Sequence, residues 1–193
     1  MRLISRILRQ AIDIPNSSLF LEPPNASHFD RWVRVRSDSQ DFLRPWEPTW
    51  AEDDLTIVGY KRRLAAYQRH RQSGWGRTFF LLDQADYTLL GGASLTRIRF
   101  GNSQSATLGY WMGVNHAGKG HMQKAVPALL SYAFDTLNLE RVEAATLPNN
   151  ERSKHLLTKC GFVEEGYARE YLEINGKRED HLLFSILRSD FKA

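Results

Sequence analysis

Three segments in the middle of the chain are rich in β-branched, aromatic and leucine residues. They cover residues 78–83, 89–100 and 106–114, and only the short turns QADY and GNSQ separate them. Such residues favour extended backbone, and turns this short join neighbouring strands that run in opposite directions. The pattern therefore predicts three successive antiparallel strands.

A helix is predicted before these strands. The segment is acidic at residues 52–54 and basic at residues 61–71, which suits the dipole of a helix running in this direction. Gly74 can end the helix. Its apolar residues recur at helical spacing and form one stripe, made of Ile57, Tyr60, Leu64 and Tyr67.

A second long helix is predicted after the strands, from about residue 118 to residue 137. Pro127 lies inside it and should kink it, because proline lacks the N–H that the helix needs. The apolar stripe nevertheless continues on both sides of the proline, through Met122, Ala125, Val126, Leu129, Ala133 and Leu137.

The remaining segments complete a mixed α/β chain. Residues 18–24 predict a short strand ended by two prolines, and Asn25 or Ser27 could cap a helix carrying Phe29, Trp32, Val33 and Val35. Residues 41–50 (DFLRPWEPTW) predict a rigid aromatic loop. A strand at 141–147, a helix at 150–160 and strands at 162–174 and 180–187 follow. We expect one central sheet in a single domain over residues 18–193, preceded by an N-terminal extension, 1–17.

Composition narrows the class of protein. The chain has 193 residues, of which 42% are apolar, and this is enough for a buried core. Its single cysteine, Cys160, excludes an internal disulfide and a four-cysteine zinc site, which favours a reducing, cytoplasmic setting. No apolar stretch approaches the roughly 20 residues that span a bilayer. The formal net charge of +4 suits an anionic ligand or a ribosomal neighbourhood.

The N-terminal residues do not resemble a secretory signal, because arginines at positions 2, 6 and 9 interrupt any apolar stretch. One face of a short basic helix could be lined by Ile4, Ile7, Leu8, Ala11 and Ile12. Such a helix could touch a membrane surface. The favoured interpretation is an extension packed on the domain or frayed from it.

The segment GKG at residues 118–120 stands where the third predicted strand gives way to the second long helix. Its glycines leave the first backbone N–H groups of the helix uncovered, and the positive end of the helix dipole faces the same space. The segment can therefore hold a phosphate, although glycines also begin helices for steric reasons. It supplies neither a Walker A loop nor a Rossmann fingerprint.

Asn150 and Ser153 mark a second helix start, about 30 residues further on. On their own they are typical of capping residues, and Gly161 ends the same helix before a strand. The intervening helix and strand can bring this start and the GKG loop to the same edge of the sheet. The two segments would then serve one site.

At these segments the sequence resembles a known family. The strand YWMGV, the loop GKGHM and the segment NNERSKHLLTKCGFVEEG are similar to the GNAT acetyltransferases. The loop FLRPWEP and the segment EEGYAREYLEINGKREDHLLFS resemble the ribosomal-protein-alanine N-acetyltransferase branch, the RimJ/RimL type. The resemblance covers residues 18–188. It implies the acyl-CoA N-acyltransferase fold, with a central, mostly antiparallel, splayed sheet and helices on both faces.

The resemblance also implies acetyl-CoA as co-substrate, with no metal. The pantetheine would run along a bulged strand at residues 110–114 and the pyrophosphate would sit on the GKGHM loop, while Asn150 and Ser153 would flank the pantetheine and thiol. The implied cofactor-binding residues are Met112, Gly113, Val114, Gly118, Lys119, Gly120, His121, Met122, Asn150 and Ser153.

Three positions depart from the family pattern. Asn115 stands where Gln or Arg is usual, and Lys124 stands where this branch often has Glu. Leu157 occupies the position of a tyrosine that serves as general acid in many members. Ser153 therefore becomes the candidate proton donor to the leaving thiolate.

The expected chemistry needs a neutral amine, a polarised thioester carbonyl and a protonated leaving sulfur. Backbone N–H groups freed by a bulge near residues 112–114 could polarise the carbonyl. An α-amine has a pKa of about 8, so a carboxylate acting through water can deprotonate it. We expect Glu170 as base and Glu47 as a ligand of the substrate amine, although either could be a solvated surface carboxylate.

The acceptor is expected to be the N-terminal α-amine of a protein whose first residue is small, such as Ala or Ser. Aromatic walls from residues 42–50 and 165–183 would leave little room beside the amine. The expected substrate-binding residues are Trp46, Glu47, Tyr167 and Tyr171. The acceptor would belong to a small-subunit ribosomal protein.

Other chemistry-bearing residues have structural explanations. His116 and His121 lack a third ligand for a metal, and Cys160 is typical of a small buried residue. The basic residues at 61–71 form either a solvated helix face or a contact with the ribosome. No membrane partner is expected, and the protein would be a monomer or a dimer.

Two alternative functions stay open. One is a non-catalytic acyl-CoA-binding module attached to the ribosome or to a transcription complex. The other is an acetyltransferase for small-molecule amines, such as an antibiotic or a polyamine. Release of free CoA in the presence of a peptide would separate the enzyme from the module.

Overall fold

The structure is a computed structural model that describes residues 11–192. Of the predicted N-terminal basic helix, Ile4, Ile7 and Leu8 lie outside the described residues. Ile12 is not helical: it belongs to β1 (Ile12–Asp13), which pairs with β2 (Leu19–Glu22). The predicted boundary between residues 17 and 18 stays a prediction. Within residues 11–192, no helix is long and apolar enough to cross a membrane.

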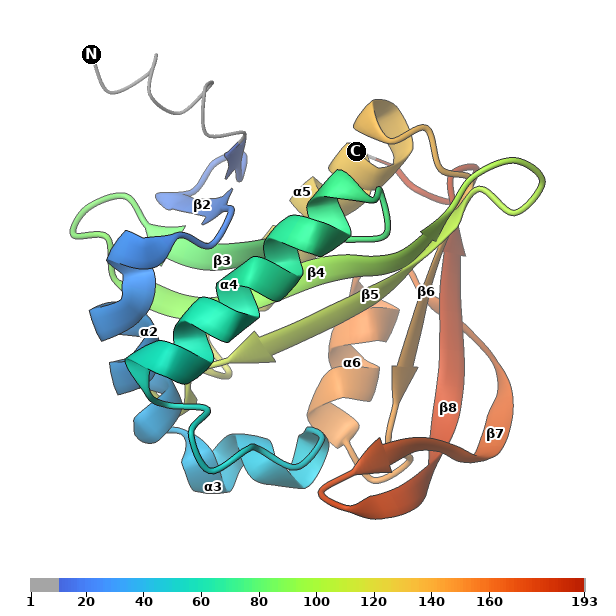
Figure 1. The fold of residues 1–193 in the computed structure, drawn as a ribbon. Coiled ribbons are helices and arrows are strands. Elements are labelled where there is room, and N and C mark those ends of the chain that lie inside the picture. Colours follow the sequence, from blue (N-terminus) through green and yellow to red (C-terminus); the bar gives the residue numbers. More distant parts are fainter. Residues whose placement is uncertain (1–10, 193) are drawn as a thin grey trace.

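One eight-stranded sheet forms the centre of the protein (Figure 1), in the order β1-β2-β3-β4-β5-β6-β8-β7. The strands predicted from the sequence are all present. Neighbours run antiparallel except β5 and β6, which run parallel. The remaining strands are β3 (Arg77–Asp83), β4 (Leu89–Arg99), β5 (Ser105–Met112), β6 (Arg141–Thr146), β7 (Val163–Ile174) and β8 (Lys177–Leu187).

Helices cover both faces of the sheet, as the resemblance implied. On the front face, which Figure 1 views, lie α2 (Phe29–Ser37) and α4 (Ile57–Gln72), and on the back face lie α5 (His121–Ser131) and α6 (Glu151–Lys159). Successive residues of a strand point to opposite faces. In β3, accordingly, Phe79 and Leu81 belong to one buried cluster and Phe80 and Leu82 to the other.

The parallel pair β5 and β6 stays together over only a short length. Ser105, Ala106 and Thr107 of β5 pair with Arg141, Val142 and Glu143 of β6. Beyond Thr107, β5 continues beside β4 as far as Met112 but no longer pairs with β6. The two strands therefore splay apart, and the opening lies in the middle of the sheet.

The predicted helix at residues 118–137 has two parts. Its α-helical part is α5, which contains Pro127, and a π-helical turn, η4 (Tyr132–Thr136), follows. The predicted loop at 41–50 was partly wrong, because it holds α3 (Gln40–Leu43) and the 3-10 turn η2 (Arg44–Trp46). Pro45 can begin such a turn because its fixed φ suits a first helical turn.

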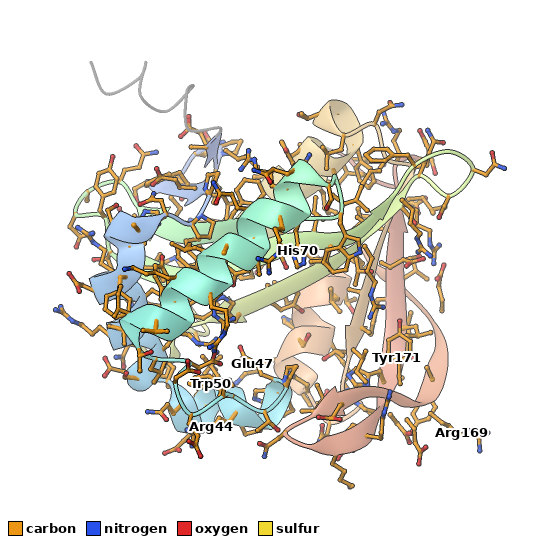
Figure 2. The ribbon with its side chains drawn as sticks, viewed as in Figure 1. Arg44, Glu47, Trp50, His70, Arg169 and Tyr171 are labelled. Carbon is orange, nitrogen blue, oxygen red and sulfur yellow. The ribbon has the colours of Figure 1, made fainter. Side chains whose placement is uncertain are left out.

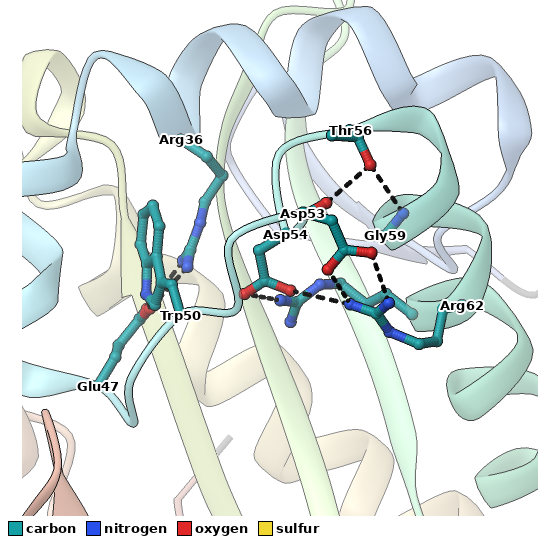
Figure 3. Close-up of polar contacts among 9 residues, drawn as sticks. Arg36, Glu47, Trp50, Asp53, Asp54, Thr56, Gly59 and Arg62 are labelled. Carbon is teal, nitrogen blue, oxygen red and sulfur yellow. Dashed lines mark hydrogen bonds and ion pairs between the residues drawn. The ribbon is translucent and has the colours of Figure 1, made fainter.

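The start of α4 is tightly packed (Figure 3). The Thr56 hydroxyl accepts a hydrogen bond from the Gly59 N–H and donates to the Asp53 carbonyl, and Asp53 pairs with Arg62. Of the predicted stripe, Tyr60 is buried and donates its hydroxyl to the Asn25 carbonyl, whereas Ile57 is exposed. The stripe was therefore wrong at Ile57, which is the first residue of the helix.

We expect Gly59→Ala to destabilise the protein. An added Cβ would lie 2.2 Å from the Asp53 carbonyl oxygen, a backbone atom that cannot move without disrupting the cap. Overpacking of this kind costs about 1–3 kcal/mol, which outweighs the better helix propensity of alanine. Urea unfolding measures the loss, with Gly166→Ala as control because its Cβ would meet open space. Equal stability of the two variants would contradict the packing.

Candidate functional site

A cleft of about 970 Å³ lies at the opening between β5 and β6. It is lined from the back face by the start of α5 and by α6, and from the front face by α3 and η2. Its strand-borne lining comes from β5, from the end of β6 and from His181 of β8. The cleft therefore passes through the sheet and connects its two faces.

One edge of β5 supplies free backbone groups to the cleft. Gly113 N–H donates to the Leu90 carbonyl at 2.8 Å, which places the backbone groups of Gly113 on the β4 side. Because these groups alternate along a strand, those of Tyr110 and Met112 face the opposite side, where no strand pairs with them. This row of unpaired groups suits an amide-containing chain laid along β5.

The expected bulge near residues 112–114 is not present. The pairing of β4 with β5 is regular from Met112 to Thr107, and its only register shift lies between Thr96 and Arg99. Moreover, Val114 N–H donates to the Ser39 hydroxyl at 2.9 Å. Gly113 and Val114 therefore have no free N–H, and neither lines the cleft. The free amide among these residues is that of Met112, and the splay of the strands frees it.

The start of α5 forms the anion-binding end of the cleft. Gly118 and Gly120 both have φ of +75°, and a Cβ on either would meet nothing within 4 Å. The first N–H groups of α5 are therefore uncovered, as the sequence predicted. Gly118, Gly120, His121 and Met122 line the cleft, whereas Lys119 is exposed beside it.

His116 also lines this end of the cleft. Burial, followed by the positive charges of Lys119 and His121, lowers the pKa of its imidazole. This concentration of positive potential around an open helix start suits an anionic ligand. Among residues 11–192, no group of three or more His, Cys, Asp or Glu side chains could hold a metal ion.

The start of α6 places a pair of hydroxyls at the back of the opening. Asn150 caps the helix by accepting a hydrogen bond from Ser153 N–H at 3.1 Å, as its position predicted. The Ser153 hydroxyl lies 2.6 Å from the hydroxyl of Tyr110, which projects from β5. Burial raises the pKa of Tyr110 to about 12, while the hydrogen bond with Ser153 acts in the opposite direction. Tyr110 therefore stays protonated at neutral pH and can donate a proton.

The sequence did not identify Tyr110 as a functional residue. Leu157, at the position of the usual tyrosine, is buried in the core. Tyr110 brings a phenol to the same helix from the opposite side, across 43 positions of sequence. A signal was available, because strand alternation places Tyr110 on the same side as Met112, which the resemblance assigned to the cofactor.

Glu47 lines the front of the cleft, but its carboxylate is already engaged. Both of its oxygens accept from the buried guanidinium of Arg36, at 2.8 and 2.6 Å, and one also accepts from the Trp50 indole N–H at 2.7 Å. The guanidinium lies between the rings of Trp50 and Trp111, 4.1 and 4.9 Å from their centres. Figure 3 shows Arg36, Glu47 and Trp50 beside the start of α4. Glu47 thus anchors the loop, and any amine would have to share it with Arg36.

Of the other predicted acceptor residues, one lines the cleft and two lie outside it. Trp46 lines the cleft and is 37% exposed. Tyr167 and Tyr171 lie on β7 and do not line it, and the Tyr167 hydroxyl donates to Asp180. The predicted walls also touch each other, because Asn175 N–H, at the tip of the hairpin between β7 and β8, donates to the Glu47 carbonyl at 2.9 Å. The groove between these walls is therefore bridged on this side.

Glu170 lies outside the cleft. It is exposed on β7, in a segment where the register with β8 shifts, and its N–H donates to Asp180. Figure 2 shows its neighbour Arg169 at the outer edge of the molecule, away from Glu47 and Trp50. The structure thus does not bring Glu170 to the cleft that Ser153 lines.

The remaining candidates have structural roles. Cys160 is buried as expected, and burial raises the pKa of its thiol to about 11. On α4, Arg62 pairs with Asp53 and Asp54, and Arg63 pairs with Asp54. Part of the basic face is therefore neutralised within the protein.

Comparisons with known proteins agree with this geometry. Residues 18–163 match the model of the acetyltransferase (GNAT) domain. The [ribosomal protein uS5]-alanine N-acetyltransferase of Escherichia coli is 33% identical over 155 residues, 80% of each chain. The spermidine N(1)-acetyltransferase of Vibrio cholerae is 31% identical over 163 residues, 83% of this chain and 88% of the relative. The structure of Mycobacterium smegmatis RimJ in complex with CoA-disulfide superposes with a TM-score of 0.85 at 27% identity, covering 91% of this chain and 84% of that one.

Proposed function

The chain belongs to the GNAT acetyltransferase family and is an acetyl-CoA-dependent acetyltransferase, and we propose that its acceptor is the N-terminal α-amine of a protein that begins with Ala or Ser. The observation that carries the proposal is the cleft through the splay of β5 and β6. It joins an anion-binding helix start on the back face to an aromatic wall on the front face, with a pair of proton-donating hydroxyls between them.

The residues of the back face fit acetyl-CoA. The open N–H groups at Gly118, Gly120 and His121 suit its pyrophosphate, and the unpaired edge of β5 suits the amides of its pantetheine arm. The acetyl thioester supplies an activated carbonyl carbon. The N–H of Met112 is placed to polarise the carbonyl, and the pair of Tyr110 and Ser153 is placed to give the leaving sulfur a proton.

Charge in the cleft favours a peptide amine over a polyamine. Three carboxylates line it, from Asp41, Glu47 and Glu151, and Glu47 is neutralised by Arg36. A polyamine carries several positive charges and would need unpaired carboxylates at more than one place. An α-amine carries at most one charge and loses it at about pH 8. The sequence similarity to the uS5-alanine enzyme supports the same acceptor.

Small-molecule acetylation is the second candidate, because a spermidine acetyltransferase is also among the relatives. The non-catalytic module is set aside, because the chain belongs to a family of enzymes. A ribosomal acceptor implies a cytoplasmic location, and contact through the unpaired basic residues of α4 would help to dock the enzyme on the ribosome. The oligomeric state, monomer or dimer, stays a prediction.

The test is a comparison of kcat/KM for CoA release with peptides beginning with Ala, Ser, Leu or Lys, and with spermidine. We expect the Ala and Ser peptides to exceed the others by tenfold or more, since a side chain too large by one or two methylenes costs about 1–3 kcal/mol. A higher kcat/KM for spermidine than for every peptide would refute the proposed acceptor and leave the fold and the co-substrate unaffected.

Trp46→Ala should flatten this preference. Removing the indole from the front wall makes room beside the amine, so the ratio of Ala to Leu peptides should fall severalfold while the affinity for acetyl-CoA stays unchanged. The matched control is Trp75→Ala, which removes a similarly exposed indole outside the cleft. An unchanged ratio in Trp46→Ala would show that Trp46 forms no part of the acceptor wall.

A further inference from the structure

His181 is a buried histidine in the cleft that the sequence analysis did not identify. It lies on β8, is only 3% exposed and lines the same cleft as Tyr110 and Ser153. Its Nδ1 lies 2.9 Å from the Glu179 carbonyl oxygen. A carbonyl oxygen can only accept a hydrogen bond, so Nδ1 must carry the proton. In the neutral ring, Nε2 then holds a lone pair.

The strand alternation places His181 on the front face. In β8, Leu182, Phe184 and Ile186 pack into the same core as α5 and α6, on the back face. His181 has the opposite parity and therefore belongs to the face covered by α2 and α4. Tyr110, in contrast, reaches α6 on the back face. The opening between β5 and β6 thus has a lone pair on one side and a pair of protonated hydroxyls on the other.

We propose that Nε2 of His181 takes the proton from the acceptor amine. The inference rests on the proposed function only in requiring that some amine enters from the front face. The acceptor enters as the ammonium and gives one proton to Nε2, from which water carries it to the solvent. The neutral nitrogen then gives its electron pair to the thioester carbon, the C–N bond forms and the C–S bond breaks. A second proton passes from nitrogen to Nε2, and the Tyr110 and Ser153 pair gives one proton to the departing sulfur. Water then returns this second proton from the imidazolium to the hydroxyl pair.

The surroundings of His181 leave Nε2 available for this role. The Tyr171 ring packs edge-on against the imidazole, 5.7 Å between centres. The neighbouring carboxylate of Asp180 is occupied by the Tyr167 hydroxyl and the Glu170 N–H, which lower its pKa in that order. Among the carboxylates considered from the sequence, Glu47 is held by Arg36 and Glu170 lies outside the cleft.

The other histidines of the cleft lie on elements that line it from the back face. His116 and His121 flank the loop before α5, and His155 lies on α6. An amine that enters past Trp46 comes from the front face, to which His181 belongs. The position of His181, its tautomer and its burial therefore all support proton transfer to this side chain.

The kinetic test compares His181→Gln and His181→Asn with the wild type across pH 6 to 9. Loss of a general base typically lowers the rate 10²- to 10⁴-fold, so we expect at least a hundredfold lower kcat near pH 7 with an unchanged KM for acetyl-CoA. The deficit should shrink above about pH 8, where an α-amine loses its own proton. Glu170→Gln is the control and should match the wild type. A loss that is equal at every pH would assign His181 a structural role and overturn the proposal.

A second readout does not depend on turnover. Long-range ¹H–¹⁵N spectra of the wild-type protein should show His181 with a proton on Nδ1 and none on Nε2, and a proton on Nε2 would overturn the proposal. The acceptor in the kinetic test is the Ala peptide or spermidine, whichever the wild type uses with the higher kcat/KM. A preference for spermidine would therefore refute the proposed acceptor, and the role of His181 would then be tested with spermidine as the acceptor.

Discussion

Tyr110→Phe is expected to lower kcat for acetyl transfer by about 10²-fold or more. The substitution removes the hydroxyl that lies 2.6 Å from Ser153 and keeps the ring that packs between β5 and α6. Proton delivery by a positioned acid contributes about 10²- to 10⁴-fold. Burial raises the pKa of Tyr110 to about 12, so the phenol keeps its proton over the whole working range of pH. Steady-state kinetics with saturating acetyl-CoA measure the loss.

Ser153 should act together with Tyr110. Ser153→Ala should lower kcat by about tenfold or more, and the double variant should lose little beyond Tyr110→Phe, because residues that act as a unit are not additive. The KM for acetyl-CoA should change little in all three variants. If only that KM rises while kcat is kept, the two hydroxyls bind the co-substrate and deliver no proton.

Gly120→Asp is expected to weaken acetyl-CoA binding at least tenfold, or by about 1.4 kcal/mol. Gly120 precedes α5, whose uncovered N–H groups form the proposed pyrophosphate site. The new carboxylate would repel the phosphates and occupy their space. Isothermal titration calorimetry with acetyl-CoA measures the change.

The control for Gly120→Asp is Gly101→Asp. Gly101 also has a positive φ, of +67°, with nothing within 4 Å of its Cβ, and it lies in the turn between β4 and β5. Both variants carry the same backbone strain and the same added charge, so only the position differs. Equal affinities for acetyl-CoA in the two folded variants would show that the pyrophosphate does not bind at this loop.

Local signals in the sequence predicted most of the fold. Apolar periodicity located the long helices and the strands, and Asn150 lies at the helix cap where its residue type placed it. The glycines of the GKG loop likewise adopt the open helix start that was expected. These features depend on residues a few positions apart, so a single sequence carries them.

The parts of the site that the sequence missed depend on tertiary register. Tyr110 contacts Ser153 only because the fold brings β5 and α6 together from distant segments. The ion pair of Glu47 with Arg36 likewise depends on tertiary structure. His181 faces the cleft because of the pairing of β8 with β6, which no local pattern encodes. Glu170 looked suitable as a base by residue type, but the register shift in β7 places it outside the cleft.

The most direct test is the position of the acetyl group on one peptide that offers two amines. The peptide begins with Ala and carries a single internal Lys, and tandem mass spectrometry after incubation with the enzyme and acetyl-CoA locates the product. The account predicts acetyl on the N-terminal nitrogen, because a lysine amine, with a pKa of about 10.4, keeps its proton and the aromatic wall favours a small first residue. Acetyl on the lysine side chain, or none on the peptide while spermidine is acetylated, would contradict it.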